Sequence, residues 1–339
     1  MPLTSDIVID YSRFDPNNTT EDTKKYVNFL EKTTNSVPRW YEVGAPRFRE
    51  IVEAGEFGGL KPVTLPEAQD LAIPSREPGR DIPVRMYKPD NGVPSKGILL
   101  HIHGGGYTLG SHTHQDALLK FYANKCQVTA LSIGYRLAPE HPYPAAREDC
   151  IDVAEHLIDN ANAHTYGPLL FLAGESGGAH FVVLTAFALL RSRPSHALKG
   201  LILPYGNYSL ALGLPSTVSY DRPVIVNHAI IAAFMEAYTP GWTAEDRRNP
   251  LASPLFEDLR ALAALSPSKK LPPALFLCGT DDPLLDDTLL MSVKWLASGS
   301  EAVVKIFPGA PHVFTVPSIE IGQEAFRYEV EFLLGKMHE

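Results

Sequence analysis

Short apolar runs alternate with helical stretches through the chain after about residue 80, and this alternation limits the possible folds more than any other feature. The runs that we predict to be strands are 82–88, 98–102, 128–134, 169–173, 201–203, 274–278 and 303–307. The stretches between them with helical spacing of apolar residues are 114–125, 145–160, 178–191, 286–297 and 322–337. Strands that are buried on both faces and separated by helices are typical of a parallel sheet. The sequence therefore predicts an α/β fold, with helices on both faces of one mostly parallel sheet.

A serine lies where one predicted strand turns into a helix. The sequence Gly-Glu-Ser-Gly-Gly at 174–178 follows the strand 169–173 directly, and a helical stretch comes next. This placement is typical of a nucleophile elbow, in which a sharp turn holds the serine in a strained conformation and excludes bulk two residues before and after it. Because the bare pattern also arises by chance, the prediction that Ser176 is a nucleophile depends on its position between strand and helix.

Three consecutive glycines follow an earlier predicted strand. His103, Gly104, Gly105 and Gly106 come directly after the run 98–102. An acyl-transfer enzyme needs open N–H groups for the oxygen that becomes negative, and the elbow mechanism expects them on a loop upstream of the serine. A flexible turn without chemistry is the alternative, whereas a phosphate loop is disfavoured because no G-x-G-x-x-G or Gly-Lys-Ser/Thr pattern is present.

A serine nucleophile needs a histidine base, which in this arrangement follows the acid in chain order. Among the histidines downstream of the serine, we consider His228, His312 and His338. His312 is the best placed, because the predicted strand 303–307 and the loop 308–311 lead directly to it.

The acid is expected in the loop 279–284, which follows the predicted strand 274–278. Asp282 is preferred over Asp281, but spacing barely separates the two. Asp286 and Asp287 fall one turn later, where the N-terminus of a helix favours carboxylates without any catalytic role.

Five segments carry a more specific resemblance. They are His-Gly-Gly-Gly-Tyr at 103–107, Tyr-Arg-Leu-Ala-Pro-Glu-His-Pro-Tyr-Pro-Ala-Ala at 135–146, Gly-Glu-Ser-Gly-Gly at 174–178, Asp-Pro-Leu at 282–284 and Pro-His at 311–312. In order and spacing the chain resembles the hormone-sensitive lipase-like family of α/β-hydrolase carboxylesterases, from about residue 80 to the C-terminus.

The resemblance implies an α/β-hydrolase fold and a serine carboxylesterase that needs no cofactor and no metal. It implies that Ser176 is the nucleophile, Asp282 the acid and His312 the base, and the family's Asp-Pro-Leu pattern decides for Asp282 over Asp281. It also implies three oxyanion N–H donors, those of Gly105, Gly106 and Gly177. The implied substrates are small esters with short- to medium-chain acyl groups.

The chain departs from the family pattern at two places. Many members read Asp-Ser-Ala-Gly-Gly-Asn around the nucleophile and His-Gly-Phe at the base, where this chain has Glu-Ser-Gly-Gly-Ala and His-Val-Phe. Gly177 still offers its N–H, although glycine adds backbone freedom to that donor. Neither departure removes a catalytic group.

Two segments fall outside the alternation of strands and helices. Apolar residues have helical spacing within 20–53, and no strand is predicted between 205 and 273. Because long insertions in compact domains are usually functional or packed elsewhere, we predict a helical cap over the serine, as the resemblance also implies. The predicted units are cap segments 1–60 and 205–255 and core segments 61–204 and 256–339. Candidate pocket walls, for which core packing is the equal alternative, are Tyr107, Tyr205 and Val313.

Charge and hydropathy restrict partners and location. The formal net charge of −9 and the lack of a basic run argue against a nucleic-acid partner. The N-terminus has no basic or apolar segment of signal type, and no apolar run is long enough to span a membrane. We therefore expect a cytoplasmic enzyme without integral membrane association. The sequence leaves open whether it is a monomer or a homodimer.

A zinc hydrolase is the alternative from another mechanistic class. The H-x-H-x-D spacing at 112–116 could gather metal ligands, and His101 and His103 precede it. Ala117 stands where the two-metal signature requires another histidine, so metal catalysis is disfavoured.

Two further alternatives share the predicted fold. A ligand receptor, like the plant hormone receptors that resemble this family but lack the catalytic histidine, is disfavoured by the presence of His312. Hydrolysis of lactones or amides, or acyl transfer to an alcohol, would use the same triad, and the sequence does not distinguish these reactions from ester hydrolysis.

Overall fold

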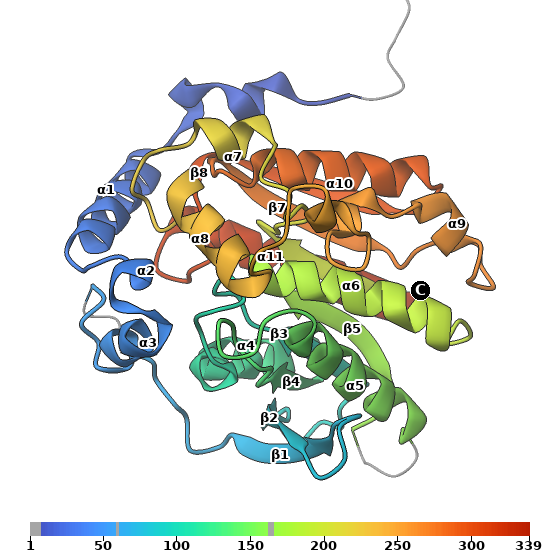
Figure 1. The fold of residues 1–339 in the computed structure, drawn as a ribbon. Coiled ribbons are helices and arrows are strands. Elements are labelled where there is room, and N and C mark those ends of the chain that lie inside the picture. The colour runs from blue at the N-terminus through green and yellow to red at the C-terminus, as the bar shows by residue number, and fades with distance from the viewer. Residues whose placement is uncertain (1–7, 59–60, 162–165) are drawn as a thin grey trace, which may run out of the picture.

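The computed structural model describes residues 8–58, 61–161 and 166–339, and within them an eight-stranded sheet forms the centre of the molecule (Figure 1). The strands are β1 (Gln69–Pro74), β2 (Asp81–Tyr87), β3 (Ile98–Ile102), β4 (Thr129–Ile133), β5 (Leu169–Gly174), β6 (Gly200–Pro204), β7 (Ala274–Asp281) and β8 (Ala302–Pro311). Their order across the sheet is β1-β2-β4-β3-β5-β6-β7-β8. β2 runs antiparallel to both β1 and β4, and the remaining neighbours are parallel. The predicted, mostly parallel sheet is confirmed.

Helices cover both faces of the sheet, because successive strand residues point to opposite sides. One face carries α4 (Asp116–Cys126) and α11 (Glu320–His338), and the other carries α5 (Ala145–Asp159), α6 (Gly177–Ser192) and α10 (Leu285–Ala297). On β3, Leu99 packs in the apolar cluster of the first face, whereas Leu100 packs in that of the second. The predicted α/β class is confirmed by these two buried layers.

The helices outside this layered core gather from two distant parts of the chain. They are α1 (Glu21–Asn35), α2 (Trp40–Val43), α3 (Ala45–Glu53), α7 (Pro215–Ser219), α8 (His228–Tyr238) and α9 (Leu259–Ala263). Short 3-10 segments are Tyr11–Phe14, Pro16–Asn18, His112–Gln115, Asp246–Arg248 and Pro254–Phe256. α2 lies beside α8 (Figure 1), and the Trp40 ring of α2 stacks on Phe234 of α8 with 5.0 Å between centroids. The N-terminal helices therefore pack against the segment that follows β6.

Three boundaries differ from the sequence prediction. β1 was not predicted, because it is an edge strand paired only with β2, and of its residues only Ile73 is buried. The predicted loops 279–284 and 308–311 are wrong in part, since β7 and β8 continue through them until Asp281 pairs with Pro311. Gly279 permits this extension, because a Cβ there would lie 1.9 Å from the carbonyl oxygen of Ala310.

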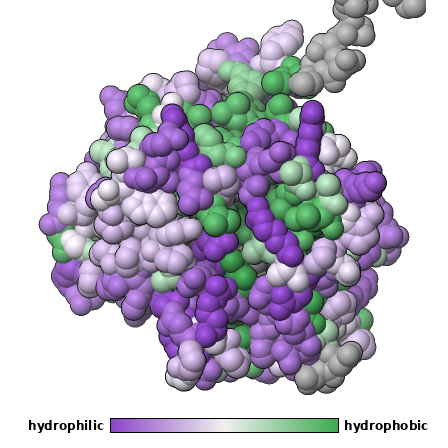
Figure 2. Space-filling model, turned by 45° about the vertical axis from the view of Figure 1, so that its right-hand side comes forward, coloured by the Kyte–Doolittle hydropathy of each residue, from purple (hydrophilic) through white to green (hydrophobic). Residues whose placement is uncertain are grey.

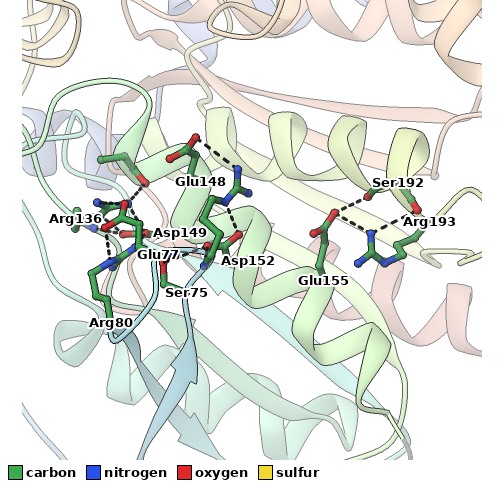
Figure 3. Close-up of polar contacts among 12 residues, drawn as sticks. Ser75, Glu77, Arg80, Arg136, Glu148, Asp149, Asp152, Glu155, Ser192 and Arg193 are labelled. Carbon is green, nitrogen blue, oxygen red and sulfur yellow. Dashed lines mark hydrogen bonds and ion pairs between the residues drawn. The ribbon is translucent and has the colours of Figure 1, made fainter.

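Ion pairs connect the β1–β2 turn to α5 (Figure 3). The Asp149 carboxylate is fully buried and receives two hydrogen bonds of 2.9 Å from Arg136, at Nε and Nη2, and a further one from Arg80. One turn later, Asp152 accepts bonds of 2.7 Å from the backbone N–H and from Nε of Arg76. A buried carboxylate is tolerated only when it is paired in this way. The network thereby holds the segment that begins at Tyr135 against α5.

Apolar side chains also reach the surface. In Figure 2 hydrophobic residues gather at the upper end of the face, near the start of the described chain, and much of the remaining face is hydrophilic. A shallow groove at the start of the described chain is lined by the exposed residues Val8, Ile9, Val293 and Leu296. Within residues 8–58, 61–161 and 166–339, no helix combines the length and the apolar character needed to cross a bilayer.

Candidate active site

Ser176 occupies the turn between β5 and α6. Its backbone has φ 54° and ψ −121°, a conformation that is strained for a residue with a side chain. Its N–H donates to the carbonyl oxygen of Pro204 at 3.0 Å, which holds the turn against the end of β6. A Cβ on Gly174 or Gly178 would lie 2.5 or 1.9 Å from the carbonyl oxygen of Ile102. The turn therefore requires glycine at both positions, because it lies directly against β3.

The structure brings Ser176, His312 and Asp282 into one hydrogen-bonded line. His312 Nε2 lies 2.9 Å from Ser176 Oγ, and His312 Nδ1 lies 2.9 Å from Asp282 Oδ2. The second carboxylate oxygen, Asp282 Oδ1, accepts the N–H of Leu284 at 2.8 Å. Asp282 and His312 are each 2% exposed, so water does not compete for these bonds. The arrangement can transfer a proton from the hydroxyl to the imidazole while the carboxylate fixes the tautomer.

The neighbouring Asp281 turns away from His312. Its Oδ2 pairs with Arg222 Nη1 at 2.6 Å, and the Tyr220 hydroxyl donates to its backbone carbonyl. Burial raises the pKa of Asp281, although the charge of Arg222 favours the ionised form. Asp281 therefore has a partner of its own, and among the described residues its carboxylate forms no hydrogen bond or ion pair with the imidazole.

Asp286 and Asp287 have structural roles at the start of α10. Asp286 Oδ2 accepts the backbone N–H of Ser216 at 2.8 Å. Asp287 Oδ1 accepts the N–H groups of Tyr208 and Ser209 at 2.6 and 2.9 Å, and burial raises the pKa of Asp287 to about 7. Both carboxylates thereby hold the chain that leaves β6 against α10.

The glycine loop lies beside the serine turn. Gly105 and Gly106 have φ 117° and 59°, and the Gly105 carbonyl accepts the N–H of Leu109 at 2.8 Å. A Cβ on Gly105 would lie 2.2 Å from the carbonyl oxygen of Leu109, and one on Gly106 would lie 2.4 Å from the ring of Phe234. The nitrogen of Gly106 is 3.4 Å from the position of a Cβ on Gly177. The three predicted N–H donors therefore come from two loops that touch each other.

A partly buried carboxylate that sequence reasoning did not assign a role connects these two loops. Glu175 Oε1 accepts the N–H of Gly104 at 2.7 Å, and Glu175 Oε2 lies 2.8 Å from His101 Nε2. Burial raises the pKa of Glu175, but the charge and hydrogen bond of His101 and the Gly104 N–H outweigh it, so the pKa is lowered overall. The sequence signal was a carboxylate directly before the serine, where many members of the family that the chain resembles have aspartate.

His103, directly before the glycines, is held in place by Tyr135. Its ring stacks on Tyr135 with 4.2 Å between centroids, and the Tyr135 hydroxyl donates to the His103 carbonyl at 2.9 Å. Burial lowers the pKa of His103 to about 3, so the imidazole stays neutral. The Tyr-Arg motif at 135–136 thus joins the loop to the ion pairs on α5.

The residues of the zinc alternative do not converge. His101 and His103 are held in the contacts described above, and His114 Nε2 lies 2.5 Å from Glu53 on α3. Among the residues that the structure describes, no group of three or more histidine, cysteine, aspartate or glutamate side chains could hold a metal ion.

A mainly apolar cavity of about 340 Å³ opens above Ser176. Its walls come from both segments outside the core, with Trp40 and Phe48 from the N-terminal helices and Ile230 and Phe234 from α8. The three candidate wall residues Tyr107, Tyr205 and Val313 also line it.

Tyr107 and Tyr205 have packing roles as well. Tyr107 stacks on Tyr238 with 4.5 Å between centroids and donates to Asn207 Oδ1 at 3.3 Å. The Tyr205 ring meets the edge of the His312 imidazole at 4.8 Å. Each ring is 1% exposed, so both tyrosines belong to the cavity wall and to the core.

Comparisons with known proteins agree with this geometry. A family model described as the alpha/beta hydrolase fold matches residues 99–316. The carboxylesterase NlhH of Mycobacterium tuberculosis is 31% identical over 277 residues, which cover 80% of this chain and 81% of that protein. The ethyl acetate hydrolase of Pseudomonas putida is 28% identical over 248 residues, which cover 72% and 74%. Among solved structures, the hyperthermophilic esterase from the archaeon Pyrobaculum calidifontis has a TM-score of 0.79 and 29% identity, and the match covers 92% of this chain and 97% of that one.

The matched region contains the glycine loop, the serine turn and His312, and it makes up more than half of the chain. Fold, motif order and relatives thus agree with the resemblance that the sequence carries. The chain belongs to the hormone-sensitive lipase-like family of α/β-hydrolase carboxylesterases and is a carboxylic ester hydrolase.

Proposed function

We propose that the protein hydrolyses short- to medium-chain acyl esters through an acyl-enzyme on Ser176, with His312 as the base and Asp282 as the acid. The observation that carries this proposal is the line of two hydrogen bonds, each 2.9 Å long, from Asp282 through His312 to the serine hydroxyl. A buried imidazole with this pair of partners can accept the hydroxyl proton as the oxygen attacks an ester carbonyl.

The proposed reaction has two halves. As Ser176 Oγ bonds to the carbonyl carbon, His312 Nε2 takes its proton and Asp282 stabilises the imidazolium. His312 then gives the proton to the leaving alcohol, which departs and leaves the acyl group on the serine. A water molecule repeats the attack with His312 as base, and the acid and the free hydroxyl are restored.

The N–H groups of Gly105, Gly106 and Gly177 are the proposed donors to the tetrahedral oxyanion. Two features support this role: Gly177 begins α6, where the helix dipole favours negative charge, and the nitrogen of Gly106 is close to it. Removing one such donor in an acyl-transfer enzyme typically costs about 2.7 to 4 kcal/mol of transition-state stabilisation.

We also propose that the segments 1–60 and 205–255 form a cap over Ser176, where residues 1–7 and 59–60 of the first segment lie outside the described structure. The apolar walls that they contribute to the cavity support this proposal. At about 340 Å³ the cavity lies near the lower end of small-molecule sites, which span about 300 to 1,000 Å³. A cavity of this size favours acyl groups of short or medium length.

Labelling with a fluorophosphonate tests the nucleophile. The reagent phosphonylates an activated serine, so peptide mass spectrometry should find the adduct on Ser176, and neither Ser176→Ala nor His312→Ala should be labelled at wild-type speed. An adduct on another residue, or equal labelling of the three proteins, would contradict the assignment.

A series of p-nitrophenyl esters tests the substrate class. We expect kcat/KM to peak at a short or medium acyl chain and to fall as the chain outgrows the cavity. Highest activity on long-chain, emulsified esters would contradict this prediction.

A further inference from the structure

Arg49 connects an N-terminal helix to the loop that carries the glycines. It lies on α3, outside the part of the chain that carries the family motifs. Its Nε and Nη2 donate to the carbonyl oxygen of Thr108 at 2.9 and 2.7 Å, and Nη2 also donates to that of Ala138 at 2.9 Å. Its Nη1 pairs with Glu140 Oε1 at 2.7 Å. One guanidinium thus joins three segments that are far apart in the sequence.

The peptide group that contains the Thr108 carbonyl also closes the turn that begins at Gly105. The N–H of this peptide, that of Leu109, donates to the Gly105 carbonyl at 2.8 Å, and the Thr108 N–H donates to the same oxygen at 3.1 Å. The Ala138 N–H donates to the carbonyl of Tyr107 at 2.9 Å. Rotation of the Thr108 peptide would therefore change the direction of the glycine N–H groups before it. Because consecutive glycines restrict their own backbone very little, this turn depends on contacts from outside.

The contact is suited to an arginine in particular. A planar guanidinium donates several hydrogen bonds in fixed directions, whereas a lysine ammonium offers one point charge. Arg49 and Glu140 also form a second bond, from Nη2 to Oε2 at 3.0 Å, so the pair is bidentate. The side chains are 25% and 39% exposed, so solvent reaches the ion pair.

The same helix forms part of the cavity wall. Phe48 and Val52, on either side of Arg49 in the sequence, line the cavity above Ser176. A displacement of α3 would therefore change the substrate cavity and the support of the glycine loop together.

We propose that Arg49 is a positioning residue, which aligns the N–H groups of Gly105 and Gly106 for the oxyanion when α3 is docked. This inference rests on the proposed function, because it assumes that those N–H groups bind the oxyanion. It assigns to the N-terminal segment a role in catalysis beyond enclosing the substrate.

The test compares Arg49→Met and Arg49→Lys with a matched control, Arg47→Met. Arg47 lies on the same helix and, among the residues that the structure describes, forms an ion pair with Glu50 alone, at 2.8 Å, with its side chain 58% exposed. Each protein is assayed for kcat and KM on the best p-nitrophenyl ester. Each is also titrated with a trifluoromethyl ketone, which forms a tetrahedral oxyanion on the serine, and with the matching methyl ketone, which serves as the ground-state probe.

For Arg49→Met we expect kcat to fall by about 10- to 100-fold, as for a misplaced oxyanion donor, while KM changes by less than about threefold. Affinity for the trifluoromethyl ketone should fall in parallel with kcat, and affinity for the methyl ketone should not. Arg49→Lys should recover part of the loss, and Arg47→Met should match the wild type.

Equal kcat in Arg49→Met and Arg47→Met would overturn the inference, as would equal weakening of both ketones, which indicates damage to the cavity alone. If Arg49→Met does not fold, Arg49→Lys and Glu140→Gln are used to test the inference instead. Wild-type kcat in both of these folded variants would overturn the inference. Failure of the proposed function gives a different result, since the wild-type enzyme would then lack fluorophosphonate labelling at Ser176.

Discussion

Replacing Asp282 by asparagine should reverse the tautomer of His312. Asp282 Oδ1 accepts the N–H of Leu284 at 2.8 Å, and a carbonyl oxygen is the only part of an asparagine that can do so. The amide NH₂ must then face His312 Nδ1 at the position of Oδ2, which is now 2.9 Å away. Nδ1 becomes an acceptor, Nε2 carries the proton, and the imidazole points an N–H at Ser176 Oγ. In this state it cannot accept the hydroxyl proton.

The expected loss of kcat in Asp282→Asn follows from this geometry. A correctly placed imidazole in the wrong tautomer lowers kcat by about 10⁴-fold in serine protease triads, which corresponds to about 5.4 kcal/mol. The matched control is Asp281→Asn, which removes only the ion pair with Arg222. A pair of this kind near the surface is worth about 0 to 1 kcal/mol, so kcat should change little.

Both variants are measured at neutral pH by p-nitrophenyl ester turnover, with active sites counted by fluorophosphonate titration and folding checked by thermal unfolding. If Asp282→Asn kept kcat within tenfold of the wild type, or if Asp281→Asn were the damaging change, the tautomer reasoning and the assignment of the acid would both be wrong.

Two further predictions follow from particular contacts. Gly177→Ala should keep kcat near the wild-type value, because its Cβ would come no closer than 3.4 Å to its neighbours. Gly178→Ala should lose activity and soluble yield, because its Cβ would lie 1.9 Å from the Ile102 carbonyl oxygen. Equal kcat and equal soluble yield in the two variants would contradict this explanation. Burial raises the pKa of Glu329, on α11, from 4.5 to about 8. Between these two pH values the folded state holds a proton that the unfolded state releases, so the free energy of unfolding falls as pH rises. Urea unfolding from pH 5 to about pH 8.5 should show this decline in the wild type and less of it in Glu329→Gln, and parallel curves would refute it.

The core of the fold could be predicted because its signals are local. The run Ile98–Ile102 is apolar except for His101 and forms β3, with every residue buried. Gln69–Pro74 carried no such signal, because an edge strand that is largely exposed needs no continuous apolar run. The ends of β7 and β8 were also missed, since pairing between neighbouring strands extends them beyond their apolar residues.

For the candidate triad, too, one residue could be predicted from a local pattern and another could not. Ser176 was recognisable because its flanking glycines at 174 and 178 form a pattern within five residues, although the requirement for them comes from the close approach of the turn to the carbonyl oxygen of Ile102. The choice between Asp281 and Asp282 needed the family motif. In the structure the two adjacent carboxylates face different partners, Arg222 and His312, and the orientation of the β7 end decides which faces which.

The sequence by itself determined the layered α/β architecture and the residues that can carry the chemistry, because periodicity and turn geometry depend on near neighbours. Only the tertiary structure decided which groups hold the glycine loop. Glu175 reaches Gly104 from 71 positions away, and Arg49 reaches Thr108 from 59. Such contacts leave no local pattern in the sequence, since a charged residue looks the same there whether its side chain contacts water or a distant carbonyl group. Only the packing of the sheet and helices brings these partners together.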